Sequence, residues 1–236
     1  MTVAPSSHPR AVRIRGHRNG SVGRVTLHTA YARALSGEAC AVVGEDGSTR
    51  TLPARRWLEA ADASDRALFV TPCSGPTLDV GCGPGRLLVA LRDHGVMAHG
   101  IDVSAEAVAL ARAAGASVTH ADVFSRIPGE GSWSHVLLAD GNVGIGGHPA
   151  RLLTRVRHLL AAGGHAHVEL AADPENGTRV TTRRLRLHVG GSASTSFDWA
   201  TVGVGAIGAV ADEAGLRVLR VDWHSGRVVA RLARAG

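Results

Sequence analysis

Short apolar runs and helical spacings divide most of the chain into a repeating series of strands and helices. The strongest helical pattern begins at Pro149, where leucines and valines recur three and four positions apart. Each predicted strand is a short apolar run bounded by glycine, proline or polar residues. The strands are expected over residues 76–80, 96–102, 117–122, 135–140 and 165–170. Strands that alternate with helices predict a parallel sheet with right-handed crossovers.

The N-terminal part of the chain has shorter and less regular patterns. A helix is expected over residues 24–35, and short helical pieces over 54–58 and 62–70. Between them, residues 40–52 predict a hairpin, because Asp46-Gly47 lies between two β-prone runs. This part is therefore expected to form a small cover rather than to continue the repeat.

The last third of the chain changes character again. Residues 181–189 alternate between apolar and polar positions, which predicts a half-buried strand with an outer row of arginine and histidine. A helix is expected over 202–214, followed by two strands over 217–223 and 227–233 joined by a tight turn at 224–226.

These patterns divide the chain into three predicted parts. Residues 1–23 combine proline, glycine, serine and arginine, and predict a flexible basic arm. Residues 24–70 form the N-terminal cover, and residues 71–236 form one α/β domain. A chain of 236 residues is long enough for such a domain with a full core.

Composition narrows the possible partners and the compartment. The net charge is +6, but the arginines are scattered and aromatic residues are few, which does not favour nucleic acid. No apolar stretch approaches ~20 residues, so we expect no membrane span. The N-terminus lacks an apolar signal segment. Three cysteines without C-x-x-C spacing predict a reduced, cytoplasmic setting and no zinc.

A glycine-rich turn lies between the first predicted strand and its helix, in the sequence Asp79-Val80-Gly81-Cys82-Gly83-Pro84-Gly85. Glycines permit close approach of a ligand to the main chain, and the helix start offers free N–H groups. The dinucleotide fingerprint would need glycine at position 86, where Arg86 stands. The motif resembles the first motif of class I S-adenosylmethionine (SAM)-dependent methyltransferases.

This resemblance implies a Rossmann-like fold: a mostly parallel seven-stranded sheet that ends in an antiparallel hairpin. It also implies SAM as the cofactor and S-adenosylhomocysteine as its product. In that family, the main chain of the glycine turn meets the methionine end of SAM. The acid before the turn, here Asp79, orients the loop and reaches the methionine amino group.

Acidic residues at the ends of successive predicted strands suit the remainder of the cofactor. Asp102 lies 21 residues beyond Gly81, where a carboxylate accepts both ribose hydroxyls; the alternative is that it only caps the next helix. By resemblance, Asp122 accepts from the adenine amino group, and Val123 lies beside the ring. The predicted cofactor-binding residues are Asp79, Gly81, Cys82, Gly83, Gly85, Asp102, Val103, Asp122, Val123 and Asp140.

The second glycine-rich stretch, residues 139–149, resembles the region where the sulfonium of SAM meets the acceptor. It lacks the Asn/Asp-Pro-Pro-Tyr/Phe tetrad of methyltransferases acting on nucleobases and glutamine. His148 is the candidate catalytic base; the alternative is that it caps the following helix or faces solvent. No metal is expected, and Glu169 is expected to support the site. Candidates for lining the acceptor pocket, or alternatively for core packing, are His28, Tyr31, Trp57 and Trp199.

The sequence therefore predicts a SAM-dependent methyltransferase that acts on a small molecule. Three alternatives stay open: an NAD(P)-dependent oxidoreductase, an RNA methyltransferase, and a protein that binds SAM without catalysis. The acceptor, the atom that is methylated and the oligomeric state do not follow from the sequence.

Overall fold

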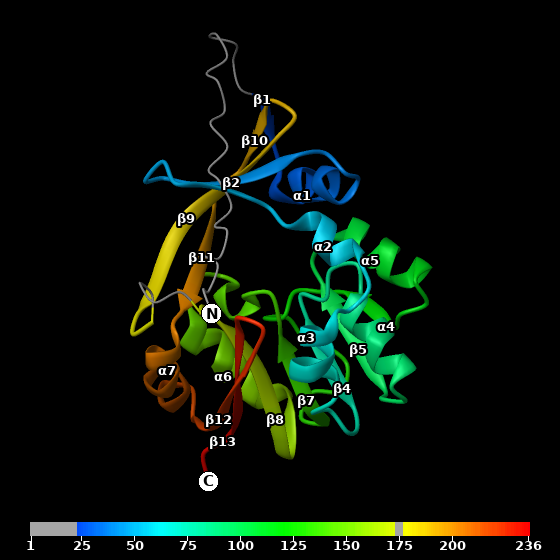
Figure 1. Cartoon of the computed structure of the whole chain (residues 1–236), viewed down its shortest axis with the longest axis vertical. Coiled ribbons are helices and arrows are strands. Elements are labelled where there is room, and N and C mark those ends of the chain that lie inside the picture. Colours follow the sequence, from blue (N-terminus) through cyan, green and yellow to red (C-terminus); the bar gives the residue numbers. More distant parts are fainter. Residues whose placement is uncertain (1–22, 173–176) are drawn as a thin grey trace, which may run out of the picture.

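The computed structural model describes residues 23–172 and 177–236 and contains two sheets (Figure 1). The predicted basic arm, apart from its last residue, lies outside the described residues. The larger sheet consists of β4 (Thr77–Val80), β5 (Ala98–Asp102), β6 (Val118–His120), β7 (Trp133–Leu138), β8 (Leu160–Leu170), β12 (Leu216–His224) and β13 (Arg227–Arg234).

Seven strands make up the larger sheet in the order β12-β13-β8-β7-β4-β5-β6. The strands from β8 to β6 run parallel. Strand β13 is antiparallel to both β8 and β12. The predicted seven-stranded sheet that ends in an antiparallel hairpin is confirmed.

Helices cover both faces of this sheet. Helix α6 (Pro149–Leu159) and helix α7 (Ile207–Glu213) pack on one face, and α4 (Arg86–Asp93) and the π-helix η1 (Arg66–Val70) pack on the other. Helix α5 (Ala105–Ala113) packs beside α4. None of the helices in the described ranges is long and apolar enough to cross a membrane.

Local signals explain where several of these elements begin. Ser104 caps α5 as predicted, because its hydroxyl accepts a hydrogen bond from the Ala107 N–H at 3.2 Å. Strand β8 begins at Leu160, earlier than predicted. Helix α6 ends before the glycine pair at 163–164, because Leu160 is fully buried and pairs with Trp133 across the sheet.

The second sheet combines two distant segments of the chain, and we call it the roof. Its strands are β1 (Gly23–Val25), β2 (Cys40–Gly44), β3 (Thr49–Thr51), β9 (Val180–Val189), β10 (Ser192–Ser194) and β11 (Phe197–Val202). Strands β2 and β3 form the predicted hairpin. Strand β9 pairs with β2 over its second half and with β11 over its first. The cover predicted over residues 24–70 is therefore only part of the roof.

Helix α1 (Leu27–Leu35) lies between β1 and β2 and packs under the roof, whereas α2 (Ala54–Leu58) and α3 (Ala63–Asp65) lie on the connection from β3 to the larger sheet. The alternation over residues 181–189 predicted one buried face, and Leu185, Leu187 and Val189 are indeed buried. They pack against α1 and β2, in a core separate from that of the larger sheet.

The helix predicted over residues 202–214 is shorter than expected. Residues up to Val202 belong to β11, because they pair with β9, and regular helix begins only at Ile207. The chain leaves β8 and returns from β11 at neighbouring points. The Ala171 N–H donates to the Val202 carbonyl at 2.9 Å, and Ala171 forms a parallel bridge with Gly203. Residues 172–202 are thus an excursion that leaves and rejoins the larger sheet at one point.

Candidate functional site

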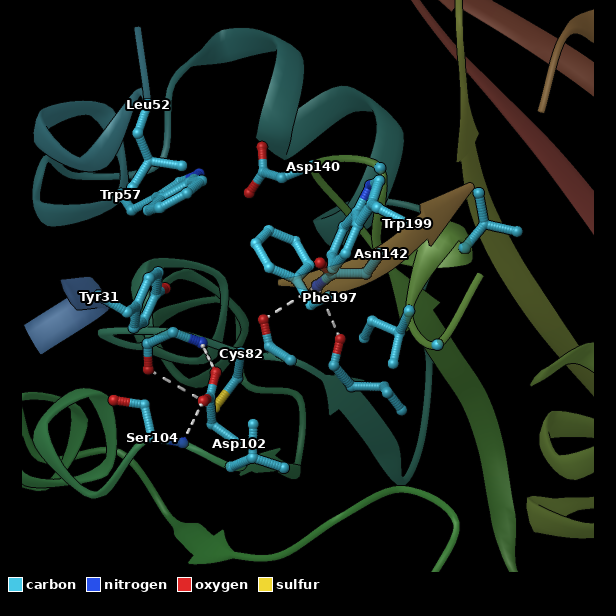
Figure 2. A pocket seen from close by; sticks show the side chains of 18 of the residues that line it. Tyr31, Leu52, Trp57, Cys82, Asp102, Ser104, Asp140, Asn142, Phe197 and Trp199 are labelled. Atoms are coloured by element: carbon cyan, nitrogen blue, oxygen red, sulfur yellow. Dashed lines mark hydrogen bonds between the residues drawn. The ribbon is translucent and has the colours of Figure 1, made fainter. Parts of the chain in front are cut away.

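A cavity of about 660 Å³ lies between the carboxyl ends of the parallel strands and the roof (Figure 2). This volume falls within the range of small-molecule sites, about 300–1,000 Å³. Most of the predicted cofactor-binding residues meet here: the cavity is lined by Gly81, Cys82, Gly83, Asp102, Val103, Asp122, Val123 and Asp140. Of that predicted set, Asp79 and Gly85 are not among the lining residues that the structure describes.

The glycine turn after β4 leaves its main chain open to the cavity. Gly81, Gly83 and Gly85 all have positive φ, at 70°, 55° and 90°. The nearest atom to a Cβ built on Gly83 would be the Tyr31 hydroxyl, 3.6 Å away. A Cβ on Gly85 would instead lie 3.0 Å from Cβ of Ala111. Gly83 therefore keeps the cavity open, whereas Gly85 permits close packing of α4 against α5; its direct role toward a cofactor stays a prediction.

Asp102 points from the end of β5 toward the glycine turn (Figure 2). One carboxylate oxygen accepts the Gly83 N–H at 2.9 Å, and the other accepts the Ser104 N–H at 2.8 Å. Burial raises the pKa of this carboxyl. An ionised carboxylate has about four acceptor positions. Two positions therefore remain for hydroxyl groups that enter the cavity.

Beyond Asp102 the cavity has an apolar edge. The Val103 residue is 48 % exposed although it is apolar, and Val123 lies buried across from the same rim. A carboxylate oxygen of Asp122 accepts the Phe124 N–H at 2.9 Å, which fixes the loop after β6. An exposed valine beside a carboxylate suits a flat, nitrogen-bearing ring.

Asp79 lies behind the glycine turn, at 2 % exposure. Burial is the largest influence on this carboxyl, and with the nearby carboxylates it raises the pKa of Asp79 to about 7, against the opposing charge of Arg86. The predicted direct contact with a cofactor amino group stays a prediction, because Asp79 does not reach the cavity wall.

His148 is not among the described residues that line the cavity. Its residue is exposed, precedes α6 and makes no side-chain cap bond there. The chain reaches His148 only after Ile145 has bridged to Trp199 on β11, and Gly146 and Gly147 then turn it away with φ of 74° and 75°. The geometry does not bring His148 to the cavity wall, and its role as the catalytic base stays a prediction.

A buried ion network, which sequence reasoning missed, supports the cavity from below. Arg86 donates two hydrogen bonds to Asp65, at 2.9 and 3.0 Å, and two to Asp140, at 2.7 and 3.1 Å. Arg227 donates to Asp65 and, at 2.8 and 2.9 Å, to Glu169. Asp140 has φ of 52°, and its N–H donates to Glu169. This network joins the glycine turn, the β7 end and the C-terminal hairpin.

The Asp65 carboxylate is buried and accepts hydrogen bonds from Arg86 and Arg227. Its side chain is 1 % exposed. Burial alone would raise the pKa of Asp65, but hydrogen bonds from Arg86 and Arg227 outweigh it and lower the pKa to about 2. Arg86 was noted in the sequence only because it replaces the last glycine of the dinucleotide fingerprint, and its part in an ion network was not predicted.

The roof supplies the aromatic side of the cavity. All four residues predicted to line an acceptor pocket do line the cavity: His28, Tyr31, Trp57 and Trp199. The rings of Tyr31 and Trp57 lie 5.7 Å apart, and those of Phe197 and Trp199 lie 6.3 Å apart, edge to face. Phe197 was missed, because the sequence did not predict β11 as a strand.

One trio of potential metal ligands lies elsewhere, in the core behind β7 and β8: Cys73, His135 and His167. The two imidazoles hydrogen-bond to each other at 3.1 Å, and the Ser74 N–H donates to His135. Burial lowers the pKa of both histidines, so both rings are neutral. Protein hydrogen bonds thus account for this pair, and the expectation of no metal stays a prediction.

Comparisons with known proteins agree with this geometry. Residues 77–164 match the family model described as "Methyltransferase domain". The structure is similar to a SAM-dependent methyltransferase from Bacteroides fragilis, solved with S-adenosylhomocysteine. The TM-score is 0.72 at 18% identity, covering 89% of this chain and 94% of that chain. No curated protein sequence matched the chain.

Two further solved structures are similar at lower scores. The CcbJ methyltransferase from Streptomyces caelestis has a TM-score of 0.57 at 17% identity, covering 76% of this chain and 92% of that chain. The 1,6-didemethyltoxoflavin-N1-methyltransferase from Burkholderia thailandensis has a TM-score of 0.55 at 16% identity, covering 77% and 81%. The predicted resemblance to class I methyltransferases and the predicted fold are confirmed.

Proposed function

We propose that this protein is a SAM-dependent methyltransferase that transfers a methyl group to a small-molecule acceptor. The observation that carries the proposal is the cavity itself. It joins the open main chain of the glycine turn, the Asp102 carboxylate and an aromatic roof in one space beside a methyltransferase domain. Solved relatives of this fold hold S-adenosylhomocysteine or SAM.

The floor of the cavity binds the cofactor in this proposal. The main chain from Gly81 to Gly83 receives the methionine end, and the free acceptor positions of Asp102 receive the ribose hydroxyls. Val103, Asp122 and Val123 surround the adenine. When bound, SAM supplies a methyl group activated on a sulfonium. The protein aligns the acceptor with that methyl, which can contribute on the order of 7–11 kcal/mol.

The roof encloses the acceptor. The cavity is closed on that side by side chains of α1, α2, β9 and β11. Similar structures include a 1,6-didemethyltoxoflavin-N1-methyltransferase with bound 1,6-didemethyltoxoflavin and an amino pentose methyltransferase. A cavity of this size and an enclosed roof suit a small acceptor better than a polymer. The buried, unpaired cysteines are compatible with the predicted cytoplasmic location.

Calorimetry with S-adenosylhomocysteine tests the proposal. We expect wild-type protein to bind it, and Asp102→Ala to weaken binding at least tenfold. Asp93→Ala is the matched control, because its half-exposed carboxylate on α4 lies outside the cavity. Unchanged affinity in Asp102→Ala would remove the ribose assignment.

The same assay separates the two enzyme alternatives. An oxidoreductase would bind NADH in preference to S-adenosylhomocysteine. An RNA methyltransferase would bind RNA with an affinity that falls steeply as salt rises. Either result would overturn the proposal.

A further inference from the structure

Aromatic side chains are concentrated at this cavity far beyond their share of the chain. The sequence contains only eight Phe, Tyr and Trp residues. Four of them line this one cavity: Tyr31, Trp57, Phe197 and Trp199. Two come from the helices before the larger sheet and two from β11, so distant parts of the chain bring them together.

The four rings form two pairs that face each other across the open space. Figure 2 shows Tyr31 and Trp57 on one side and Phe197 and Trp199 on the other, with the Asp140 carboxylate between them. Aromatic rings favour flat partners that can stack or meet edge to face. Such an arrangement favours a planar ring over a saturated one of the same size.

Two carboxylates on this side of the cavity are already held in place by arginines, and the side chains of Arg50, Arg56 and Arg86 line the same cavity. The side chains of Asp140 and Glu169 are 20 % and 13 % exposed, and both line the cavity. Asp140 is bound by Arg86, and Glu169 by Arg227. Among the described lining residues the one histidine is His28, on α1.

These groups suit a nitrogen nucleophile. When a neutral amine attacks, its lone pair forms the new N–C bond as the S–C bond breaks. The sulfonium becomes a neutral thioether, and the positive charge moves to the acceptor nitrogen, which afterwards releases a proton to water. Carboxylates beside this position stabilise that cation. A phenol must instead lose its proton to a base, and carboxylates are much weaker bases than a phenolate.

We propose that the acceptor is a planar aromatic amine, bound between the Tyr31–Trp57 pair and the Phe197–Trp199 pair with its nitrogen toward Asp140 and Glu169. This inference rests on the proposed function and adds the substrate class to it.

Three probes of similar size separate the two elements of the proposal. Binding of 1-naphthol and decahydro-1-naphthol to protein saturated with S-adenosylhomocysteine tests planarity, since both are neutral alcohols. We expect 1-naphthol to bind at least tenfold more tightly. Transfer of labelled methyl from SAM to 1-naphthylamine and to 1-naphthol tests the nucleophile. We expect the amine to react at least tenfold faster.

Variants locate the binding position. Trp57→Ala and Trp199→Ala should each weaken 1-naphthylamine binding at least tenfold while affinity for S-adenosylhomocysteine stays within twofold. The conservative variants Trp57→Phe and Trp199→Phe should restore most of that binding. Trp223→Ala is the matched control, because this tryptophan is 59 % exposed on β12 and outside the cavity.

Each negative outcome has a distinct meaning. If the wild-type protein does not bind S-adenosylhomocysteine, the proposed function itself is overturned. Retained cofactor binding with equal affinity for the planar and saturated probes would overturn only the planar acceptor. Transfer to 1-naphthol as fast as to the amine, or to neither probe, would overturn the amine.

Discussion

The floor and the roof of the cavity contact its contents with different parts of the polypeptide. The floor presents main chain, as at Gly83, and carboxylates whose positions are fixed by buried hydrogen bonds, as at Asp102. The roof presents side chains such as Trp199 and Leu187 from strands of the second sheet. Main-chain contacts tolerate few substitutions, whereas side-chain contacts change with every substitution. The floor is thus suited to a constant ligand and the roof to a variable one.

The largest effect should follow from breaking the ion network beneath the floor. Arg86→Met removes the guanidinium that binds both Asp65 and Asp140, and leaves Arg227 as the main remaining partner of these two carboxylates. We expect a loss of about 3–5 kcal/mol in the free energy of unfolding, measured with urea. Arg92→Met, on the same helix, breaks a half-exposed pair with Asp93 and exposed hydrogen bonds to the Ala114 and Gly115 carbonyls, and should cost about 1 kcal/mol. An equal loss in the free energy of unfolding in both variants would show that the network adds no stability.

A second effect concerns pH and the carboxyl behind the floor. Burial raises the pKa of Asp79 from 3.8 to about 7, so the folded protein binds this proton more tightly than the unfolded chain. The resulting stability is fully present below pH 3.8 and is lost as pH rises through 7. The free energy of unfolding of Asp79→Asn should therefore exceed that of wild type by about 2–4 kcal/mol at pH 8, but not at pH 4. Urea unfolding between pH 4 and pH 8 measures this difference in free energy. A difference that does not change with pH would contradict the raised pKa of Asp79.

The main-chain character of the floor predicts a third effect. In Gly83→Val a branched side chain enters the cavity where the nearest atom is now the Tyr31 hydroxyl. We expect S-adenosylhomocysteine affinity to fall at least a hundredfold by calorimetry. Gly95→Val controls for backbone strain, because Gly95 has φ of 78° and no atom near its Cβ position. A similar loss in both variants would mean that strain, and not obstruction, is responsible.

The smallest predicted effect lies where roof and floor touch. A Cβ on Gly144 would collide with the Ala200 carbonyl and lie 2.6 Å from Nε1 of Trp199. Gly144→Ala should displace β11, so that 1-naphthol affinity falls about tenfold while S-adenosylhomocysteine affinity stays within twofold. Gly208→Ala on α7, with open space around it, is the control. Equal weakening of both ligands would mean that floor and roof are not separable.

Features governed by local signals could be predicted from the sequence. The cap at Ser104, the left-handed glycine turn and the helix that begins at Pro149 each depend on a few neighbouring residues. The position of Asp102 beside the turn also followed, because parallel strands bring their carboxyl ends to one edge.

Features that depend on distant pairing could not be predicted. The alternation over residues 181–189 indicated a buried face, but nothing in it identified β2 as the partner strand. The aromatic residues of β11 were therefore not assigned to a strand, and His148 was placed near the reaction although the loop before it bridges to Trp199. Arg86 gave no local sign of its partner Asp65, because that pairing requires α3 and η1 to pack beside α4.

The bridge between Ala171 and Gly203 has a consequence for how such a protein could diversify. Because the bridge closes the two ends of the excursion, a replacement of different length or composition would need to satisfy that closure and the pairing with β1 and β2. Acceptor preference could then be inherited as a cassette, exchanged between lineages while the methyl-donor machinery beneath it stays intact.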